Sequence, residues 1–391
     1  MYVKLKPGKE KSVLSRHPWI FSGAIQEAEI NPKSSAPVEI QNAKGERLAF
    51  GDWDGGSQIR VRVFHWTDKE TNFDESFWHK RWADIWNRKV STFLSKDTNA
   101  FRFLFSESDL SPGMIVDCYD KTAVILCTTP KARERKEILC TFLKKQGVEL
   151  IIEKPAKDHL VKEKTNILYG KQKDVYFYES GIQYFLDWEE GQKTGFFLDQ
   201  KENRDLVKQY AKGKSVLNAF SYSGGFSLAS LVGGAVRVDS LDISERAIQI
   251  LEKNLHSNAL VPSKANHRSI QQDAFVFLKN MESDLYDLMI LDPPAFSKSV
   301  DSIQKASRGY KEINRQALLK IKKNGFLFTF SCSQHISRDL FQKIIFAAAK
   351  DAGREARVLK VLSQSPDHGF SIFHPEGEYL KGFLIQVDER G

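Results

Sequence analysis

The feature that most constrains the fold is a strict alternation of short apolar runs and amphipathic helical stretches from about Lys214 onward. The helical stretches include residues 244–258 and 306–322. Parallel strands need right-handed crossovers, which helices usually supply, so this region predicts a parallel, doubly wound α/β sheet. The predicted parallel strands are 215–219, 236–241, 287–291 and 326–331, and a final pair is 357–362 and 383–387, the last antiparallel.

The first half of the chain follows other patterns. Short strands between glycine-rich turns over residues 1–70 predict a small β-barrel. An aromatic helical stripe follows over 74–93, and we expect its tryptophans to pack in a core or between domains. We therefore expect three domains: a β-barrel over 1–70, a small α+β middle domain over 71–185, and the Rossmann-like α/β domain over 186–391.

Composition narrows the class of protein. The chain has 391 residues, of which 41% are hydrophobic and 28% charged, so it can fill several cores and is not disordered. A formal net charge of +8 favours a polyanionic partner, although scattered basic residues are as common on a merely solvated surface. A homodimer is compatible with the sequence.

Cysteine spacing and apolar run lengths indicate the compartment. The four cysteines contain no C-x-x-C pair, so we expect no zinc site, no other metal and no disulfide framework, and a reducing cytoplasm fits. The N-terminus is charged where a signal peptide would be apolar, and no apolar run is long enough to span a bilayer. We expect no membrane association.

Ligands of an open α/β sheet bind at the carboxyl ends of its strands. The first strand here is followed by the turn 220–225, Phe-Ser-Tyr-Ser-Gly-Gly, whose glycines allow close approach of a ligand. Asp242 ends the second strand at a spacing typical of a ribose contact, because Ser244 is the better helix cap. Asp273, followed by Ala274, could accept from an adenine amino group or equally cap a helix. Because G-x-G-x-x-G is absent, S-adenosylmethionine fits better than a dinucleotide.

Two further strand ends carry the predicted chemistry. Asp292 is followed by Pro293 and Pro294, whose fixed φ and missing N–H groups leave carbonyls available to hold the edge of a flat nitrogenous base. Cys332 follows the next strand, where a thiolate could add to C6 of a pyrimidine and activate C5 toward a methyl group. Asp292 would stabilise the charge that develops at N3. We expect the remaining cysteines to be inert core residues: Cys118, Cys127 and Cys140.

Taken together, motifs along almost the whole chain resemble one known family. It is the class I S-adenosylmethionine-dependent large-subunit ribosomal RNA methyltransferases that make 5-methylcytosine and carry an N-terminal PUA domain. The motifs that carry this resemblance are Leu5–Gly8, Arg16–Ile25, Phe105–Asp109, Pro112–Asp117, Lys193–Gln200 with Asn203–Arg204, Tyr222–Phe226, Asp292–Pro294, Arg308–Tyr310 and Ser331–Ser333.

The resemblance implies a role for each candidate residue. Cys332 would be the nucleophile, and Asp292 would grip the cytosine edge with the help of Pro293 and Pro294. Arg204 would pair with the donor's carboxylate or brace the loop, and the PUA-like domain would grip RNA through its shape and phosphates. The methyl-donor pocket would comprise Phe220, Ser221, Tyr222, Gly224, Asp242, Asp273 and Ala274, with Gln200 and Arg204 beside it.

The leading hypothesis is therefore methylation of C5 of a cytosine in large-subunit ribosomal RNA through a covalent bond between Cys332 and C6. A second hypothesis keeps the donor but moves the methyl group to a ring or exocyclic nitrogen, which needs no cysteine. A third is a non-catalytic RNA-binding factor for ribosome assembly, for which Asp242, Asp292 and Cys332 would be expendable. Hydride transfer is disfavoured because the phosphate-binding turn is missing.

Overall fold

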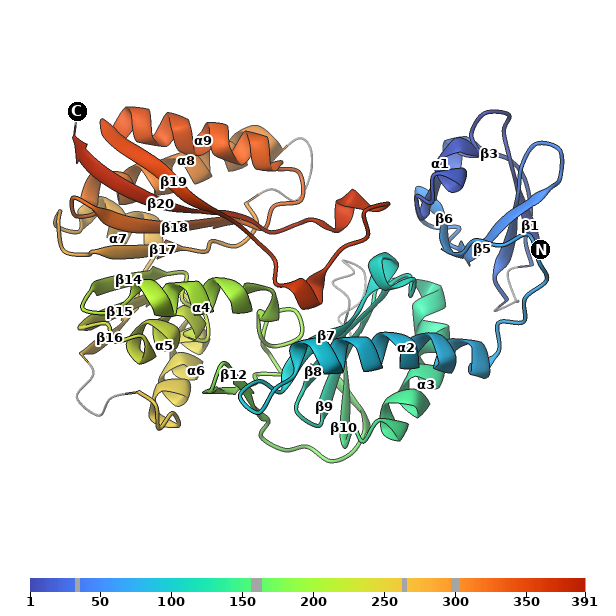
Figure 1. The fold of residues 1–391 in the computed structure, drawn as a ribbon, viewed down its shortest axis with the longest axis horizontal. Coiled ribbons are helices and arrows are strands. Elements are labelled where there is room, and N and C mark those ends of the chain that lie inside the picture. Colours follow the sequence, from blue (N-terminus) through green and yellow to red (C-terminus); the bar gives the residue numbers. More distant parts are fainter. Residues whose placement is uncertain (32–35, 156–163, 262–265, 297–301, 391) are drawn as a thin grey trace. The chain divides into compact units, whose positions relative to one another are not determined.

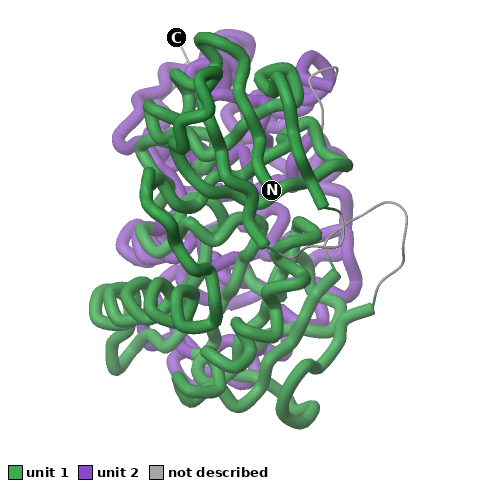
Figure 2. The backbone as a smooth tube through the Cα atoms, turned by 90° about the vertical axis from the view of Figure 1, so that its right-hand side faces the viewer, with its two compact units in different colours: residues 1–177, 186–196, 366–377 green, residues 178–185, 197–365, 378–391 purple. Residues whose placement is uncertain are grey.

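The computed structural model describes residues 1–31, 36–155, 164–261, 266–296 and 302–390 (Figure 1). The chain forms two compact units, each built from several separate stretches (Figure 2). Unit 1 comprises residues 1–177, 186–196 and 366–377. Unit 2 comprises residues 178–185, 197–365 and 378–391.

Unit 1 begins with a six-stranded sheet in the order β2-β6-β5-β4-β1-β3. Alternate residues of its strands point inward, and they form one core that includes Val3, Ile40 and Val61. A small β domain with its own core is therefore present at the N-terminus, as the sequence predicts. The elements are β1 (Tyr2–Leu5), α1 (Lys11–Leu14), β2 (Trp19–Phe21), β3 (Ile25–Glu29), β4 (Val38–Gln41), β5 (Arg47–Trp53) and β6 (Ile59–His65).

The rest of unit 1 is a five-stranded sheet, ordered β11-β10-β9-β8-β7, with two helices packed against it. Trp78 and Trp82 of α2 are 2% and 0% exposed, so the prediction that these tryptophans pack in a core is confirmed. The elements are α2 (Glu75–Phe93), β7 (Ala100–Phe105), β8 (Met114–Tyr119), β9 (Thr122–Cys127), α3 (Pro130–Lys145), β10 (Leu150–Lys154) and β11 (Asn166–Tyr169). A two-stranded sheet follows along the chain, β12 (Tyr176–Glu179) and β13 (Ile182–Phe185), and its residues from 178 onward belong to unit 2.

Unit 2 is built on a seven-stranded sheet in the order β16-β15-β14-β17-β18-β20-β19. The five strands β14 to β18 are parallel, and β20 lies antiparallel between β18 and β19. The predicted doubly wound sheet with a final antiparallel strand is confirmed. The strands are β14 (Ser215–Ala219), β15 (Arg237–Asp242), β16 (His267–Gln271), β17 (Leu288–Leu291), β18 (Gly325–Ser331), β19 (Arg354–Ser363) and β20 (Lys381–Arg390).

Helices cover both faces of this sheet. Neighbouring strand residues alternate between two cores, so that Val216 and Leu288 face one layer while Leu217 and Met289 face the other. Helices α4 and α5 contribute to the first core, and α7, α8 and α9 to the second. The helices are α4 (Lys201–Tyr210), α5 (Gly225–Val232), α6 (Glu245–His256), α7 (Ala274–Asn280), α8 (Ile303–Lys320) and α9 (Arg338–Ala352).

Candidate active site

The predicted chemical residues follow strands that end at one edge of the sheet in unit 2. Ala219 pairs with Leu241 on one side and with Leu291 on the other, and Leu291 pairs with Thr329. The segments that continue from these strands therefore leave the sheet at the same edge. The structure thus brings together the turn at 220–225 and the residues Asp242, Asp292 and Cys332.

Cys332 differs in its surroundings from the other cysteines. It is half-buried, whereas Cys118, Cys127 and Cys140 are buried. Burial raises the pKa of Cys118 well above its usual range, that of Cys127 to about 12 and that of Cys140 to about 11. The prediction that these three are core residues is confirmed, since their thiols stay protonated at neutral pH.

The loop that carries Asp292 lies beside Cys332. The Cys332 Sγ is 3.9 Å from the carbonyl oxygen of Pro293, to which the thiol can donate. Asp292 is half-buried, Pro293 is buried and Pro294 is exposed. A thiol and a carboxylate are therefore held on adjacent segments, as an attack on a ring gripped at its edge would require.

Two side chains near Cys332 were not predicted as site residues. The hydroxyl of Tyr310, in α8, lies 2.9 Å from the Ser333 Oγ, and burial raises its pKa. The ammonium of Lys381, the first residue of β20, donates to the carbonyl oxygen of Ser333 at 2.9 Å. Tyr310 belongs to a motif of the family resemblance, whereas Lys381 gives no signal in the sequence because its position depends on the pairing of β20 with β18.

The turn after β14 has an unusual backbone. Phe220, Tyr222 and Gly224 have φ values of 62°, 46° and 82°, so two non-glycine residues adopt the left-handed region within five positions. The N–H of Ser221 donates to Leu241 at 2.9 Å, which fixes the turn to the neighbouring strand. Such strain persists where the surroundings enforce it, and it is common at ligand sites.

Asp242 accepts two backbone hydrogen bonds from the segments around it. Its carboxylate oxygens lie 2.9 Å from the N–H of Tyr222 and 2.9 Å from that of Ser244. Ser244 itself caps α6 by accepting from Ala247, so the predicted cap is confirmed. A carboxylate has about four acceptor positions, which leaves Asp242 able to accept from ribose hydroxyls as well.

Asp273 is the N-cap of α7. Its Oδ1 accepts from the N–H of Val276 at 3.0 Å, and Ala274 is buried behind it in the first turn. Asp273 therefore caps the helix, which is one of its two predicted roles. The contact with an adenine amino group stays a prediction, because capping occupies one oxygen of the carboxylate.

Arg204 forms a buried bidentate ion pair with Glu179. Its Nε and terminal nitrogen lie 2.6 Å and 2.7 Å from the two carboxylate oxygens. Burial disfavours the charged guanidinium, but the charge and hydrogen bonds of Glu179 more than offset this, and the pKa of Arg204 is raised. Glu179 was not singled out in the sequence. Gln200, also buried, accepts from the amide of Asn203 at 2.6 Å at the start of α4.

The turn has features that suit S-adenosylmethionine. Within the described chain, the buried Ser221 Oγ has no hydrogen-bond partner, which is costly unless a ligand supplies one. A Cβ added to Gly224 would lie 2.8 Å from the Leu251 Cγ, so any larger residue would have to displace Leu251. An unsatisfied hydroxyl, a glycine turn and the Asp242 carboxylate together match the polar groups of a sulfonium nucleoside.

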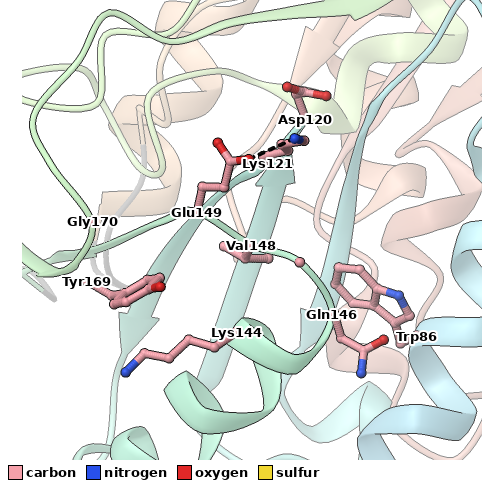
Figure 3. Close-up of a pocket in the computed structure, with 10 residues that line it drawn as sticks. Trp86, Asp120, Lys121, Lys144, Gln146, Val148, Glu149, Tyr169 and Gly170 are labelled. Atoms are coloured by element: carbon pink, nitrogen blue, oxygen red, sulfur yellow. Dashed lines mark hydrogen bonds and ion pairs between the residues drawn. The ribbon is translucent and has the colours of Figure 1, made fainter.

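A separate hollow of about 700 Å³ lies in unit 1 (Figure 3). Lys144 and Tyr169 face each other across it, with the ammonium 4.5 Å from the ring centre, and Lys121 pairs with Glu149 at its rim. None of the predicted site residues lines this hollow.

The described residues lack two other features. They contain no group of three or more His, Cys, Asp or Glu side chains that could hold a metal ion. None of the helices found among them is both long and apolar enough to cross a membrane.

Comparisons with known proteins show the family of this chain. The family model for S-adenosylmethionine-dependent methyltransferases matches residues 134–362, and the model for PUA-like domains matches residues 3–66. Ribosomal RNA large subunit methyltransferase I of Aeromonas salmonicida is 37% identical over 99% of this chain and 99% of its own. The protein of the same name from Shewanella amazonensis is 37% identical over 98% of this chain and 99% of its own.

Solved structures share the fold. A Streptococcus mutans protein assigned as a SAM-dependent methyltransferase has a TM-score of 0.84 at 22% identity, over 99% of this chain and 100% of its own. A second structure, of a protein bound to SAH, has a TM-score of 0.86 at 21% identity over the same shares. From the family model and the full-length relatives at 37% identity, the chain belongs to the S-adenosylmethionine-dependent methyltransferases whose curated members are named ribosomal RNA large subunit methyltransferase I.

Proposed function

We propose that the protein transfers a methyl group from S-adenosylmethionine to C5 of a cytosine in large-subunit ribosomal RNA, through a transient bond between Cys332 and C6. The names of the full-length relatives support ribosomal RNA as the substrate. The observation that carries the covalent mechanism is the half-buried Cys332, whose Sγ lies 3.9 Å from the Pro293 carbonyl on the Asp292 loop. Methylation of a nitrogen would need no nucleophile at this position.

The chemistry follows from the low reactivity of cytosine C5. The thiolate of Cys332 attacks C6, and the electron pair of the C5–C6 double bond becomes available at C5. Asp292 stabilises the charge that builds up at N3 by hydrogen bonding to the ring edge. When bound, S-adenosylmethionine supplies an activated methyl group to C5. Loss of the C5 proton to water then restores the double bond, and the sulfur leaves C6 with its electron pair.

The donor would be held at the turn after β14. We assign ribose recognition to Asp242. The backbone that approaches the donor closely would be that of Phe220, Ser221, Tyr222 and Gly224. Asp273 and Ala274 would contact the adenine, with Gln200 beside the pocket. For Arg204, the ion pair with Glu179 supports the bracing role over a contact with the donor's carboxylate. Pro293 and Pro294 would contact the base through their carbonyls.

The PUA-like barrel, expected over residues 1–70, would grip RNA by shape and phosphate contacts. The net charge of +8 favours such a partner. We also propose that the protein acts in the cytoplasm, because its four cysteines are free thiols. Self-association as a homodimer stays a prediction.

Trapping with 5-fluorocytidine tests the covalent step. Fluorine cannot leave C5 as a proton does, so RNA containing this base should stay bonded to the protein after methyl transfer. We expect a denaturation-resistant protein–RNA complex from the native protein, with Cys332 as the modified residue by mass spectrometry.

Two cysteine variants complete this test. Cys332→Ala should abolish the complex and lower methylation by about a thousandfold or more, while its affinity for S-adenosylmethionine is retained. Cys140→Ala, which removes a buried thiol of α3, should form the complex and methylate RNA as the native protein does. Undiminished formation of 5-methylcytosine by Cys332→Ala would exclude the covalent mechanism. A product methylated on nitrogen, identified by nucleoside digestion and mass spectrometry, would support the second hypothesis instead.

A further inference from the structure

Lys381 lies next to the proposed nucleophile through the pairing of strands. It is the first residue of β20 and pairs with Ser331, the last residue of β18, and with Ser363 of β19. Its side chain is 3% exposed, and its ammonium donates to the carbonyl oxygen of Ser333 at 2.9 Å. The peptide segment that contains Cys332 is therefore contacted by a buried positive charge.

A lysine in such surroundings is costly to bury. Burial lowers the pKa of Lys381 to about 8, against the charges of Cys332 and Glu378, which raise it, while Arg338 lowers it further. Within the described part of the chain, the Lys381 ammonium forms no ion pair with a carboxylate, and Ser333 is its hydrogen-bond acceptor. A neutral carbonyl does not neutralise the charge of this buried ammonium, so the charge can stabilise a neighbouring anion.

Two described groups beside Cys332 do not themselves favour its thiolate. The Pro293 carbonyl, 3.9 Å from Sγ, accepts from the neutral thiol and offers nothing to an anion. Tyr310 packs at the same segment with its hydroxyl 2.9 Å from the Ser333 Oγ, and the charge of Cys332 is among the influences that raise its pKa, after burial. A buried cation close to this segment favours a negative charge on the sulfur.

We propose that Lys381 is a positioning residue for Cys332, whose ammonium stabilises the thiolate before it attacks C6 and again when the sulfur leaves. This inference rests on the proposed function. The thiol proton is lost to solvent, the thiolate electron pair forms the S–C6 bond, and the same pair returns to sulfur when that bond breaks. Lys381 remains protonated throughout, so it neither donates nor accepts a proton in the cycle.

The rate of Cys332 alkylation as a function of pH tests this role directly, because only the thiolate reacts with iodoacetamide. Modification of the Cys332 peptide would be followed by mass spectrometry in the full-length protein. Lys381→Gln keeps a hydrogen-bond donor without the charge, and Lys381→Arg keeps the charge. We expect the thiol titration of Lys381→Gln to move up by about one pH unit, which lowers alkylation at pH 7 by about tenfold. Lys381→Arg should titrate close to the native protein.

The acid limb of the methylation rate should move by the same amount in Lys381→Gln, with the KM for S-adenosylmethionine unchanged. Lys320→Met is the matched control, since Lys320 likewise donates to a backbone carbonyl, that of Met281 at 2.8 Å, away from Cys332. Its alkylation profile should equal that of the native protein.

Each outcome decides the proposal. A native-like thiol titration in folded Lys381→Gln, checked by circular dichroism, would overturn it. If Lys381→Gln does not fold, an upward shift in Lys381→Arg equal to that expected for loss of the charge would overturn it as well, and a native-like titration there would support it. Full methylation by Cys332→Ala would instead refute the proposed function and would leave the measured coupling between Lys381 and the Cys332 thiol unaffected.

Discussion

At the scale of single residues, one side chain at the sheet edge has two candidate roles. Asp273 caps α7 through one carboxylate oxygen, and the same carboxylate is proposed to accept from the adenine of the donor. Serine is as good a helix cap as aspartate but carries no charge. Substitution can therefore separate the two roles.

We expect Asp273→Ser to leave the free energy of unfolding within about 0.5 kcal/mol of the native value, because the cap is kept. Its affinity for S-adenosylmethionine should fall by about tenfold, the effect of one lost charge-assisted hydrogen bond. Asp273→Ala should lower both quantities, with a loss of about 1 kcal/mol in stability. Urea denaturation and calorimetry measure the two, and unchanged donor affinity in Asp273→Ser would leave Asp273 as a cap alone.

The residues that could be predicted from the sequence are those whose position depends on local order. Asp292 and Cys332 each follow an apolar strand, so the parallel sheet alone places them at one edge. Lys381 and Glu179 could not be predicted, because each is placed by a partner distant in the sequence, Ser331 in one case and Arg204 in the other. Their environments arise only from tertiary packing.

At the scale of elements, the pair Arg204–Glu179 joins α4 to β12 within unit 2. Both side chains are almost fully buried, so neither charge has water to replace a lost partner. This contact fixes the helix that precedes β14 and the turn 220–225.

We expect Arg204→Met to destabilise the protein by about 3–5 kcal/mol, since it leaves the Glu179 carboxylate buried and unpaired. Adding Glu179→Met should recover much of this loss, because two apolar side chains can pack where the ion pair was. Urea denaturation gives the stabilities, and calorimetry gives the donor affinity of the double variant, which should be close to native. A stable double variant that no longer binds S-adenosylmethionine would instead assign Arg204 to the donor's carboxylate.

The turn between β14 and α5 depends on Gly224 for two reasons. It has a φ of 82°, and a side chain would meet Leu251. Gly213 separates these causes, because its φ is 72° but nothing lies within 4 Å of an added Cβ. Gly213→Ala should therefore cost only the left-handed strain, about 1–2 kcal/mol.

Gly224→Ala should cost about 1–3 kcal/mol more than Gly213→Ala, because Leu251 must move. It should also weaken binding of S-adenosylmethionine, whereas Gly213→Ala should not. Equal losses of stability in urea denaturation, with native donor affinity in both variants, would contradict a special role for Gly224.

Elements were predictable where their pattern was long. Strands β14, β15, β17 and β18 have near-continuous apolar runs and helices α6 and α8 are amphipathic, and their bounds fall close to those expected. Strand β16 was not among the predicted strands, because its residues are mostly polar. Strands β2 and β11 were missed because three or four residues show too little periodicity. Strand β7 was missed although five of its six residues are buried, since a run apolar on both faces lacks the alternation that marks a strand.

At the scale of the whole molecule, the excess of positive charge should govern RNA binding. Association with RNA releases counterions, so its affinity should fall by tenfold or more between about 50 and 200 mM salt. Binding of S-adenosylmethionine should change little. Affinity for RNA that is independent of salt would contradict phosphate contacts as the main source of binding.

Charge reversal can locate this effect. Lys9 and Lys11 are exposed in the PUA-like barrel, and Lys343 and Lys350 are exposed on α9. Changing the first pair to Glu should lower RNA affinity more than changing the second pair, although both variants alter the net charge equally. A larger effect of the α9 pair, measured by filter binding, would contradict the barrel as the RNA grip.

The division of the chain into units could not be predicted. Residues 366–377 belong to unit 1, although they come between β19 and β20 of the unit 2 sheet. A pattern of strands and helices shows where elements begin, but not which neighbours a connecting segment contacts. Around the expected boundary at 186 the chain changes unit more than once: residues 178–185 belong to unit 2, residues 186–196 to unit 1 and residues 197–365 to unit 2.

This interleaving has a consequence for how such a protein can change over time. A single genetic break after residue 365 would remove a piece of one unit together with β20, the antiparallel strand between β18 and β19 of the other. Recombination at a single point therefore cannot move either unit as a complete domain. Descendants of this gene are expected to inherit the two units together, and to vary by substitution rather than by exchange of modules.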